Sequence, residues 1–272
     1  MIQIPSAFQE FITPDCDRAA FIQNYMNSAG LEAPILQMEG KNHIYVKFPQ
    51  NQYNPMFRIK TVIAHYDRIG IGANDNSAAV FCLMQWAAEL AKKYGSWANP
   101  SGTNFHNIRL IFTDGEELGS GGVSEQGAFI LAKVFKRLGI LNDDIFVFDC
   151  MGRGNIPVIC KNPFSPSVSE SFIKKQNELE KSAVSILSSA AGHYFVLPAS
   201  YSDNAGFIAN GIPAVQITML PSPEIESYVR FGEKPLTWQY FHTPKDNLLN
   251  LTPESFQITA AILNVLAAYK KL

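Results

Sequence analysis

Four short apolar runs alternate with segments of helical periodicity, and this alternation constrains the fold of the 272-residue chain most strongly. The apolar runs are IKTVIAH, NIRLIFT, DIFVFDC and PAVQIT. Helical spacing of apolar residues appears around residues 16–28, 77–94, 124–138, 168–190 and 253–270. Because parallel strands need crossover connections, usually helices, this order predicts an α/β fold. We expect a mostly parallel central sheet with helices on both faces.

The length suits one large hydrophobic core, so we expect a single domain over residues 1–272. Thr252 and Pro253 predict the start of the last helix, as a cap and a first-turn proline. Two stretches, QNQYNPM and residues 219–241, fit neither period. A long loop inside a compact domain is uncommon unless it is functional. We therefore expect residues 219–241 to form one wall of a substrate pocket.

The charge pattern excludes several classes of partner. The net charge is -2 and the sequence has no basic stripe, which argues against nucleic acid or a membrane surface as partner. A small molecule or a peptide is the expected substrate.

The N-terminus lacks a basic start followed by an apolar stretch, as a secretory signal would have. The cysteines have no CxxC spacing, which favours buried free thiols. Both features predict a cytoplasmic protein; the oligomeric state is not encoded in any recognisable pattern.

Acidic and imidazole side chains follow the apolar runs. His65 ends the first run, Glu116 and Glu117 follow the second, and Asp149 lies within the end of the third. Ligands of α/β sheets gather at the carboxyl ends of the strands, so we expect these side chains to meet there. Asp67 is close enough to His65 to accept a hydrogen bond from the far imidazole nitrogen and fix its tautomer.

Asp75 lies in GANDNSAAV, at the mouth of a predicted helix and after Gly72, which permits an unusual turn. A helix cap would explain an Asp here, since such a cap stabilises by about 1 kcal/mol. A carboxylate can also bridge two cations about 3.5 to 4 Å apart. Because other candidate ligands converge on the same edge of the sheet, we interpret Asp75 as a bridging ligand.

Glu116 and Glu117 can divide two tasks between them. A metal lowers the pKa of a bound water to about 7, and a nearby carboxylate can accept that proton and pass it to a leaving amine. We assign Glu116 as the general base and Glu117 as a ligand, although adjacent glutamates are often solvated surface. The GSGG that follows lacks the Lys and Ser/Thr of a phosphate-binding loop.

His242, in FHTPKDN, completes the candidate ligand set. A single histidine in such a context is more often structural than a ligand. In the same way, Asp149 considered alone would be a turn residue at the end of a strand. Together with His65, Asp75 and Glu117 they form a set of one imidazole and two or three carboxylate contacts per ion. Such a set suits two Zn²⁺ ions, and Mn or Co are also compatible with it.

The segments AHYD, GANDNSAAV, DGEELGSGG, FDCMG, SDNAGFIANGIPAV and FHTPKDN, in this order, resemble the family 28 zinc metallopeptidases. The resemblance spans about residues 60–250. It implies an α/β/α sandwich with a mixed sheet and a cis peptide between Asp75 and Asn76. It also implies one zinc held by His65 and Asp149 and another by Glu117 and His242. Asp75 would bridge the ions, Asp67 would orient His65, and Glu116 would shuttle the proton.

The sequence departs from this family at a few positions. Some members carry a Tyr before the last His ligand, where this chain has Phe241 with Tyr240 one residue earlier. Asn204 replaces the His of an SDH-like pattern, and we expect the adjacent Asp203 to be a supporting site residue. Trp238, Tyr240 and Phe241 are our candidates for substrate binding. The missing export signal is a further departure.

These observations predict a zinc-dependent aminopeptidase, a hydrolase that removes the N-terminal residue of peptides. A first alternative is a glutaminyl cyclase, a single-zinc relative with a similar DGEE turn; PSPE and Trp238 near His242 are reminiscent of that branch. A second alternative is a catalytically silent binding protein of the same fold. The complete ligand set argues against the second, and the side-chain specificity is not readable from the sequence.

Overall fold

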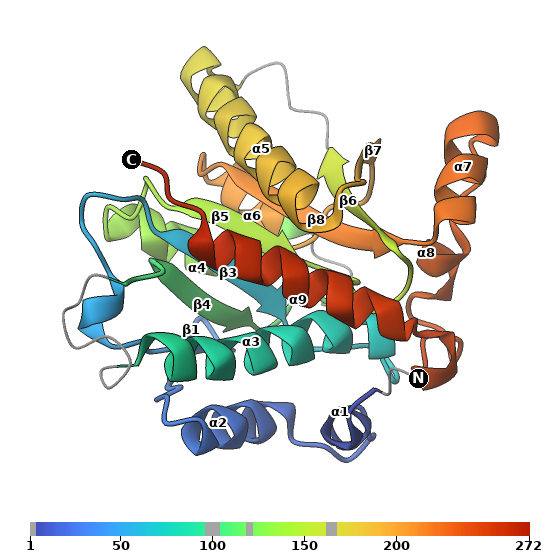
Figure 1. Cartoon of the computed structure of the whole chain (residues 1–272), viewed down its shortest axis with the longest axis horizontal. Helices are drawn as coiled ribbons and strands as arrows, with labels where there is room; N and C mark the ends of the chain where they lie inside the picture. Colours follow the sequence, from blue (N-terminus) through green and yellow to red (C-terminus); the bar gives the residue numbers. More distant parts are fainter. Residues whose placement is uncertain (1–3, 96–103, 118–121, 162–167) are drawn as a thin grey trace.

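The computed structural model describes residues 4–95, 104–117, 122–161 and 168–272. A mixed eight-stranded sheet runs through the molecule with helices on both sides (Figure 1). The spatial order of the strands is β1-β2-β4-β3-β5-β8-β6-β7. The strands are β1 (Ile35–Met38), β2 (Lys41–Val46), β3 (Lys60–His65), β4 (Ile108–Thr113), β5 (Asp144–Phe148), β6 (Ile156–Lys161), β7 (Phe195–Pro198) and β8 (Ala214–Leu220).

The helices form two layers, and in Figure 1 α3, α5 and α9 lie in front of the sheet while α4 and α6 lie behind it. The α-helices are α1 (Ser6–Phe11), α2 (Arg18–Ser28), α3 (Ala79–Tyr94), α4 (Gly127–Arg137), α5 (Glu170–Ala191), α6 (Asn204–Ala209), α7 (Ser222–Phe231), α8 (Leu236–Tyr240) and α9 (Pro253–Ala268). A π-helical turn, Ala73–Ala78, precedes α3. The helices α1 and α2 pack outside α3, where the Phe8 and Phe81 rings meet edge to face at 5.4 Å.

The four predicted apolar runs form the centre of the sheet. They become β3, β4, β5 and β8, which are adjacent and parallel and are buried along nearly all of their length. Successive side chains of a strand point to opposite faces. Ile63 and Ile111 therefore pack with α4 and α6, whereas Val62 and Leu110 pack with α3 and α9. The predicted α/β architecture, with a mixed and mostly parallel sheet between helices, is confirmed.

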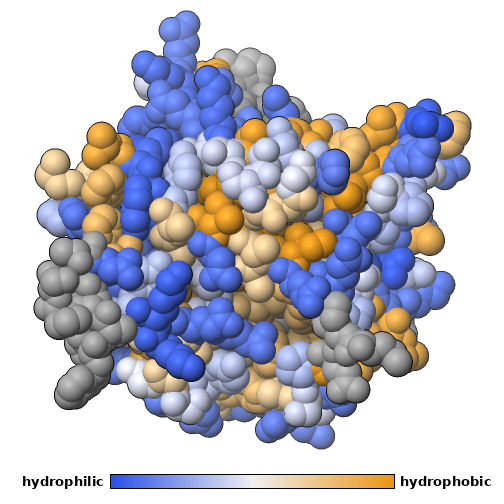
Figure 2. All heavy atoms as spheres, in the orientation of Figure 1, coloured by the Kyte–Doolittle hydropathy of each residue, from blue (hydrophilic) through white to orange (hydrophobic). Residues whose placement is uncertain are grey.

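The edges of the sheet were not predicted. β1 and β2 form an antiparallel hairpin on one side, and β6 runs antiparallel to β8 on the other. The prediction that residues 219–241 form a long loop is wrong, because β8 continues to Leu220 and α7 and α8 follow. QNQYNPM contains a short 3₁₀ turn, Gln50–Gln52. Figure 2 shows apolar side chains on the protruding α7, where Val229 and Phe231 are exposed.

Other predicted details have mixed outcomes. The last helix begins at Pro253 as expected, but the Thr252 hydroxyl accepts a hydrogen bond from the Gly154 N–H (3.1 Å) rather than capping it. All four cysteines are free thiols. In the part of the chain that the structure describes, no helix has the length and apolar character needed to cross a bilayer. The cytoplasmic location stays a prediction.

Candidate metal centre

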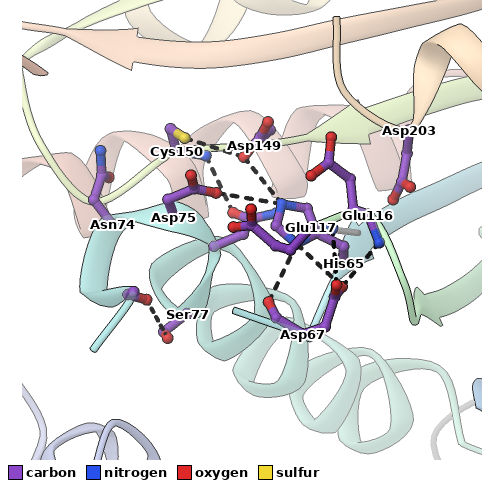
Figure 3. A network of polar contacts seen from close by, with 12 residues as sticks. His65, Asp67, Asn74, Asp75, Ser77, Glu116, Glu117, Asp149, Cys150 and Asp203 are labelled. Atoms are coloured by element: carbon purple, nitrogen blue, oxygen red, sulfur yellow. Dashed lines mark hydrogen bonds and ion pairs between the residues drawn. The ribbon is translucent and has the colours of Figure 1, made fainter. Parts of the chain in front are cut away.

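The parallel strands bring the predicted site residues to one edge of the sheet. His65 is the last residue of β3, Asp149 directly follows β5, and Glu116 and Glu117 follow β4. Since β3 lies between β4 and β5, their carboxyl ends are neighbours. Figure 3 shows these side chains converging from separate strands, with Asp75 reaching the same space from the turn before α3.

Two groups of ligand-type atoms share Asp75. The Nε2 atom of fully buried His65 lies 3.4 Å from Asp75 Oδ1 and 3.6 Å from Asp149 Oδ1. On the other side, Nε2 of half-exposed His242 lies 2.8 Å from Glu117 Oε2 and 3.5 Å from Asp75 Oδ2. Within each group the ligand-type atoms lie within 4.8 Å of one another. The two oxygens of Asp75 thus face one group each.

Asp67 joins His65 to the glutamate pair. Its Oδ1 atom lies 3.5 Å from Nδ1 of His65, and its carboxylate accepts the backbone N–H groups of Glu116 (3.2 Å) and Glu117 (2.9 Å). Burial disfavours the charge of Asp67, but the hydrogen bonds from His65 and from these amides outweigh burial and lower its pKa. The residue therefore stays anionic while it orients three neighbours.

The glutamates carry strongly perturbed proton affinities. Burial raises the pKa of Glu116 to about 9, and burial with the neighbouring Asp75 charge raises the pKa of Glu117 to about 7. The amide of Gln126 donates to Glu116 Oε1 at 3.2 Å and to its backbone oxygen at 3.1 Å. Ligand-type atoms of Glu116, Glu117 and His65 also lie within 4.8 Å of one another, so Glu116 reaches the same space as the predicted ligands.

These residues fit a bound divalent cation. Buried carboxylates at this density are unfavourable as anions unless positive charge compensates them. Among the described residues, buried Nε2 of His65 and buried Oε1 of Glu117 have no hydrogen-bond partner. Imidazole nitrogens and carboxylate oxygens are the ligands that Zn²⁺ takes in proteins. Two such ions would satisfy these atoms and balance the acidic charge.

The backbone of the Asp75 segment is held by hydrogen bonds that its N–H groups donate to a side chain distant in the sequence. Its peptide bond to Asn76 is cis, and Gly72 before it has a positive φ of 55°. The Asp246 carboxylate accepts the N–H groups of Asn74 (2.7 Å) and Asp75 (3.1 Å). Because Asp246 lies four residues after His242, one short loop positions both His242 and the shared carboxylate. This role of Asp246 was not predicted.

The flanking asparagines tie the same segment to the turn that carries Asp149. The Asn74 side chain accepts the Gly152 N–H at 2.7 Å. The Asn76 side chain donates to the Phe148 carbonyl at 2.9 Å and accepts the Cys150 N–H at 3.1 Å. Asn74 and Asn76 therefore connect the two loops, a role that was not predicted.

A cavity of about 200 Å³ opens beside these acids. Asp75, Glu116, Asp149 and His242 line one side of it, and the predicted substrate residues Trp238 and Phe241 line another.

Two other predicted site residues, the substrate-binding candidate Tyr240 and the supporting residue Asp203, do not line this cavity. The Tyr240 ring instead contacts Arg153, at 5.1 Å from the guanidinium carbon, and Lys245, at 5.5 Å from its amine. Asp203 is fully buried, accepts a hydrogen bond from the Thr113 hydroxyl, and lies beside Glu116 in Figure 3. Burial raises the pKa of Asp203 to about 6.

The comparison with known families decides the relationship. The model of peptidase family M28 matches residues 44–267 of this chain. The chain belongs to peptidase family M28. The match includes every predicted ligand position and the Asp246 loop. No curated protein matches the chain in sequence.

Solved structures of M28-like fold superpose on this family member along most of its length. The LapA aminopeptidase of Legionella pneumophila gives a TM-score of 0.67 at 14% identity, covering 97% of this chain and 69% of that one. BSAP, a zinc aminopeptidase from Bacillus subtilis, gives 0.54 at 19% identity, covering 84% and 49%. A glutaminyl cyclase from Porphyromonas gingivalis gives 0.61 at 18% identity, covering 96% of both chains. These likenesses concern the fold.

In this M28 chain the helix that carries Trp238 is held in place by Arg153, a residue that was not predicted to contribute to the site. The Arg153 guanidinium donates to Glu224 Oε1 (2.8 Å), to the Thr237 hydroxyl (3.0 Å) and to the Asn250 carbonyl (3.1 Å). Arg153 follows Asp149 in the chain by four residues, whereas Glu224 belongs to α7 and Thr237 to α8. The guanidinium thus ties α7, and α8 with its cavity residue Trp238, to the turn that carries Asp149. No local pattern in the sequence signals this contact.

Proposed function

We propose that the chain is a metal-dependent aminopeptidase that hydrolyses the N-terminal peptide bond of peptide substrates. The observation that carries the proposal is the pair of ligand groups that share Asp75. His65 and Asp149 would hold one Zn²⁺, Glu117 and His242 the other, and Asp75 would contact both. Mn or Co would also suit this donor set. In this proposal residues 1–272 form one catalytic domain.

The bound cations would supply Lewis-acid polarisation of the scissile carbonyl and a lowered pKa for the attacking water. The remaining chemistry belongs to side chains of the protein. Glu116 lines the cavity, and the Gln126 amide orients one of its oxygens. In this proposal Glu116, whose pKa of about 9 would be lowered by the positive charge of the bound cations, accepts the proton of the water and returns it to the departing amine. Asp67 holds the His65 ring in the orientation that directs Nε2 toward Asp75 and Asp149.

Substitution of Glu116 tests the assignment of the general base. Glu116→Gln keeps the size of the side chain and its contact with Gln126 but removes the proton acceptor. We expect turnover of aminoacyl anilides to fall at least about 100-fold, because general-base catalysis contributes 10²–10⁴, while metal content per chain is unchanged. Glu125→Gln, at an exposed position nearby, is the matched control and should keep full activity. Full activity in Glu116→Gln would refute the base assignment.

A glutaminyl cyclase is the second candidate, and the near-complete mutual coverage with the Porphyromonas gingivalis cyclase favours it. The group formed by His65, Asp75 and Asp149 supports the aminopeptidase, since a single-zinc enzyme does not need this second set of donors. Two measurements separate the candidates: the number of tightly bound zinc ions per chain, and cyclisation of an N-terminal Gln peptide beside anilide hydrolysis. A chain that binds no divalent metal would favour the silent binding protein instead.

A further inference from the structure

The segment between β3 and α3, residues 66–78, carries two of the proposed site residues, Asp67 and Asp75. The helices α1 and α2 pack outside α3 (Figure 1), and both precede the family match, which begins at residue 44. The connection between these two helices, residues 12–17, nevertheless meets the β3–α3 segment at its two ends. An arginine makes each of these contacts.

Arg68, the residue after Asp67, makes the first contact. Its guanidinium donates to four backbone carbonyls, those of Ile12 (2.9 Å), Thr13 (2.6 Å), Pro14 (3.4 Å) and Ile71 (2.9 Å). Three of these carbonyls belong to the α1–α2 connection and one to the β3–α3 segment itself. Because a guanidinium presents its donors in a rigid planar fork, it fixes the two segments relative to each other.

Arg18, the first residue of α2, makes the second contact. Its Nη1 atom donates to the Ser77 hydroxyl at 2.9 Å, and this hydroxyl donates to the Gly72 carbonyl. Ser77 is fully buried and lies in the same π-helical turn as Asp75 (Figure 3). The Arg18 guanidinium also packs over the Phe11 ring, at 4.4 Å from its centre. Hydrogen bonds thus lead from α2 to both ends of the turn that carries Asp75.

The burial of Arg18 is unfavourable in itself. The residue is only 7% exposed, and among the described residues its Nε and Nη2 atoms have no hydrogen-bond partner. Burial and the charge of Arg68 lower the pKa of Arg18 to about 9, whereas the charges of Asp67 and Asp75 favour its cation. An apolar side chain would pack against Phe11 without this desolvation. The hydrogen bond to the ligand turn and the nearby site carboxylates are what the guanidinium adds.

We propose that Arg18 and Arg68 are positioning residues of the metal centre, which make the α1–α2 connection a brace for the segment that carries Asp67 and Asp75. Neither arginine belongs to the ligand groups, so both act through the backbone. Asp75 offers one oxygen to each group, so a displaced turn would disturb both groups together. A Cβ on Gly72 would lie 2.5 Å from the Asp75 carbonyl oxygen and 2.8 Å from Arg68 Cβ, so the brace and the turn are in close contact. The inference rests on the metal centre of the proposed function, but not on peptide hydrolysis.

Arg68→Met keeps the aliphatic part of the side chain and removes all four hydrogen bonds. We expect zinc affinity, measured in competition with a chelator, to fall about tenfold or more, as for other residues that support metal ligands. Arg68→Lys retains the charge and part of the donor capacity and should recover part of the affinity. Arg137→Met, at an exposed position of α4, is the matched control for the loss of an arginine and should bind zinc as the wild type does.

Hydrogen exchange in the zinc-free chain distinguishes a local brace from a general contribution to stability. The N–H groups of Asn74 and Asp75 donate to Asp246, so their exchange reports opening of the turn. In Arg68→Met we expect these two amides to exchange about tenfold faster or more, while the amides of β5 keep their wild-type rates. Ser77→Ala removes the acceptor of Arg18 without removing its charge, and it should have the same local effect.

The outcomes separate this inference from the proposed function. Weaker zinc binding with locally faster exchange supports the brace even if no anilide is hydrolysed, in which case only the proposed function fails. Unchanged zinc affinity in Arg68→Met would overturn the brace while hydrolysis persists. An equal acceleration of exchange in the turn and in β5 would also overturn it, since the arginine would then stabilise the fold as a whole. A wild-type chain that binds no divalent metal would overturn both.

Discussion

Acidification from about pH 8 to about pH 5 should remove about 2 kcal/mol of folding stability through His106 alone. His106 is fully buried two residues before β4, at the end of the sheet opposite the candidate metal centre. Its Nδ1 atom accepts the Ile108 N–H at 3.0 Å, and its ring contacts Phe48 and Tyr94. Burial, with the charges of Lys60 and Lys270, lowers the pKa of His106 to about 3.

The sign follows from the two pKa values. The unfolded chain binds a proton on this imidazole below the ordinary value of 6.5, whereas the folded protein binds one only near 3. The stabilising contribution is therefore present above about pH 6.5 and is lost as the pH falls toward 3. At about pH 5 the unfolded imidazole is almost fully protonated and the folded one is neutral. A pH of about 5 lies about 1.5 units below the pKa of the unfolded imidazole. At about 1.36 kcal/mol per unit, the free energy of unfolding is therefore lower by about 2 kcal/mol.

Urea unfolding of the wild type and His106→Asn at both pH values measures this contribution. The Asn side-chain oxygen can still accept the Ile108 N–H, but it does not titrate. The variant will be less stable at pH 8 because it packs less well, so the informative quantity is the difference between the two pH values. We expect the wild type to lose about 2 kcal/mol more than the variant. Equal losses in both proteins would refute the assignment of His106 as a buried neutral imidazole.

Two further substitutions probe how the site and its helices are held. Asp246→Asn leaves one oxygen to serve the amides of Asn74 and Asp75, so zinc affinity in a chelator competition should fall about 10- to 100-fold, as for other residues that support metal ligands; unchanged affinity would contradict the role of Asp246. Gly206→Ala would place a Cβ 2.4 Å from the Phe129 backbone nitrogen and should reduce the urea-unfolding free energy by about 1–3 kcal/mol or more. Exposed Ala209→Gly, in the same helix, is its control and should change stability by at most about 1 kcal/mol.

The central strands and the grouping of the site residues were accessible from the sequence for a simple physical reason. Strands that are buried on both faces have continuous apolar sequences, so they can be recognised. The residue that follows such a sequence lies at the carboxyl edge of the sheet. His65 and Asp149 could therefore be placed beside each other although 84 residues, the difference of their numbers, separate them. The cis peptide after Asp75 came from the family resemblance, since nothing in GANDNSAAV reveals a peptide isomer.

The edge strands and the pocket wall could not be predicted in the same way. β1 and β7 are four residues long and only partly buried, so neither shows a clear period. Residues 222–240 form two helices that are attached through Arg153 and through the packing of Ile225 and Trp238, contacts between segments that are far apart in the sequence. Tyr240 was predicted to bind substrate because it is aromatic and near His242. Its ring contacts the cationic side chains of Arg153 and Lys245 instead, which only the tertiary arrangement determines.

The chemistry and the selectivity of this site rest on different parts of the fold. The proposed ligands lie mainly at the ends of β3, β4 and β5, whose positions are set by ladders of backbone hydrogen bonds in the interior. Trp238 and Phe241 come from α8 and the residue after it. This helix is held to the interior by the hydrogen bond between Arg153 and Thr237 and by packing of Trp238 against the cluster that contains Val158 and Leu220. Gln216 connects the two parts, since it extends from a central strand, contacts Asp149 and lines the cavity. Substitutions in α8 should therefore alter substrate preference with little effect on metal affinity.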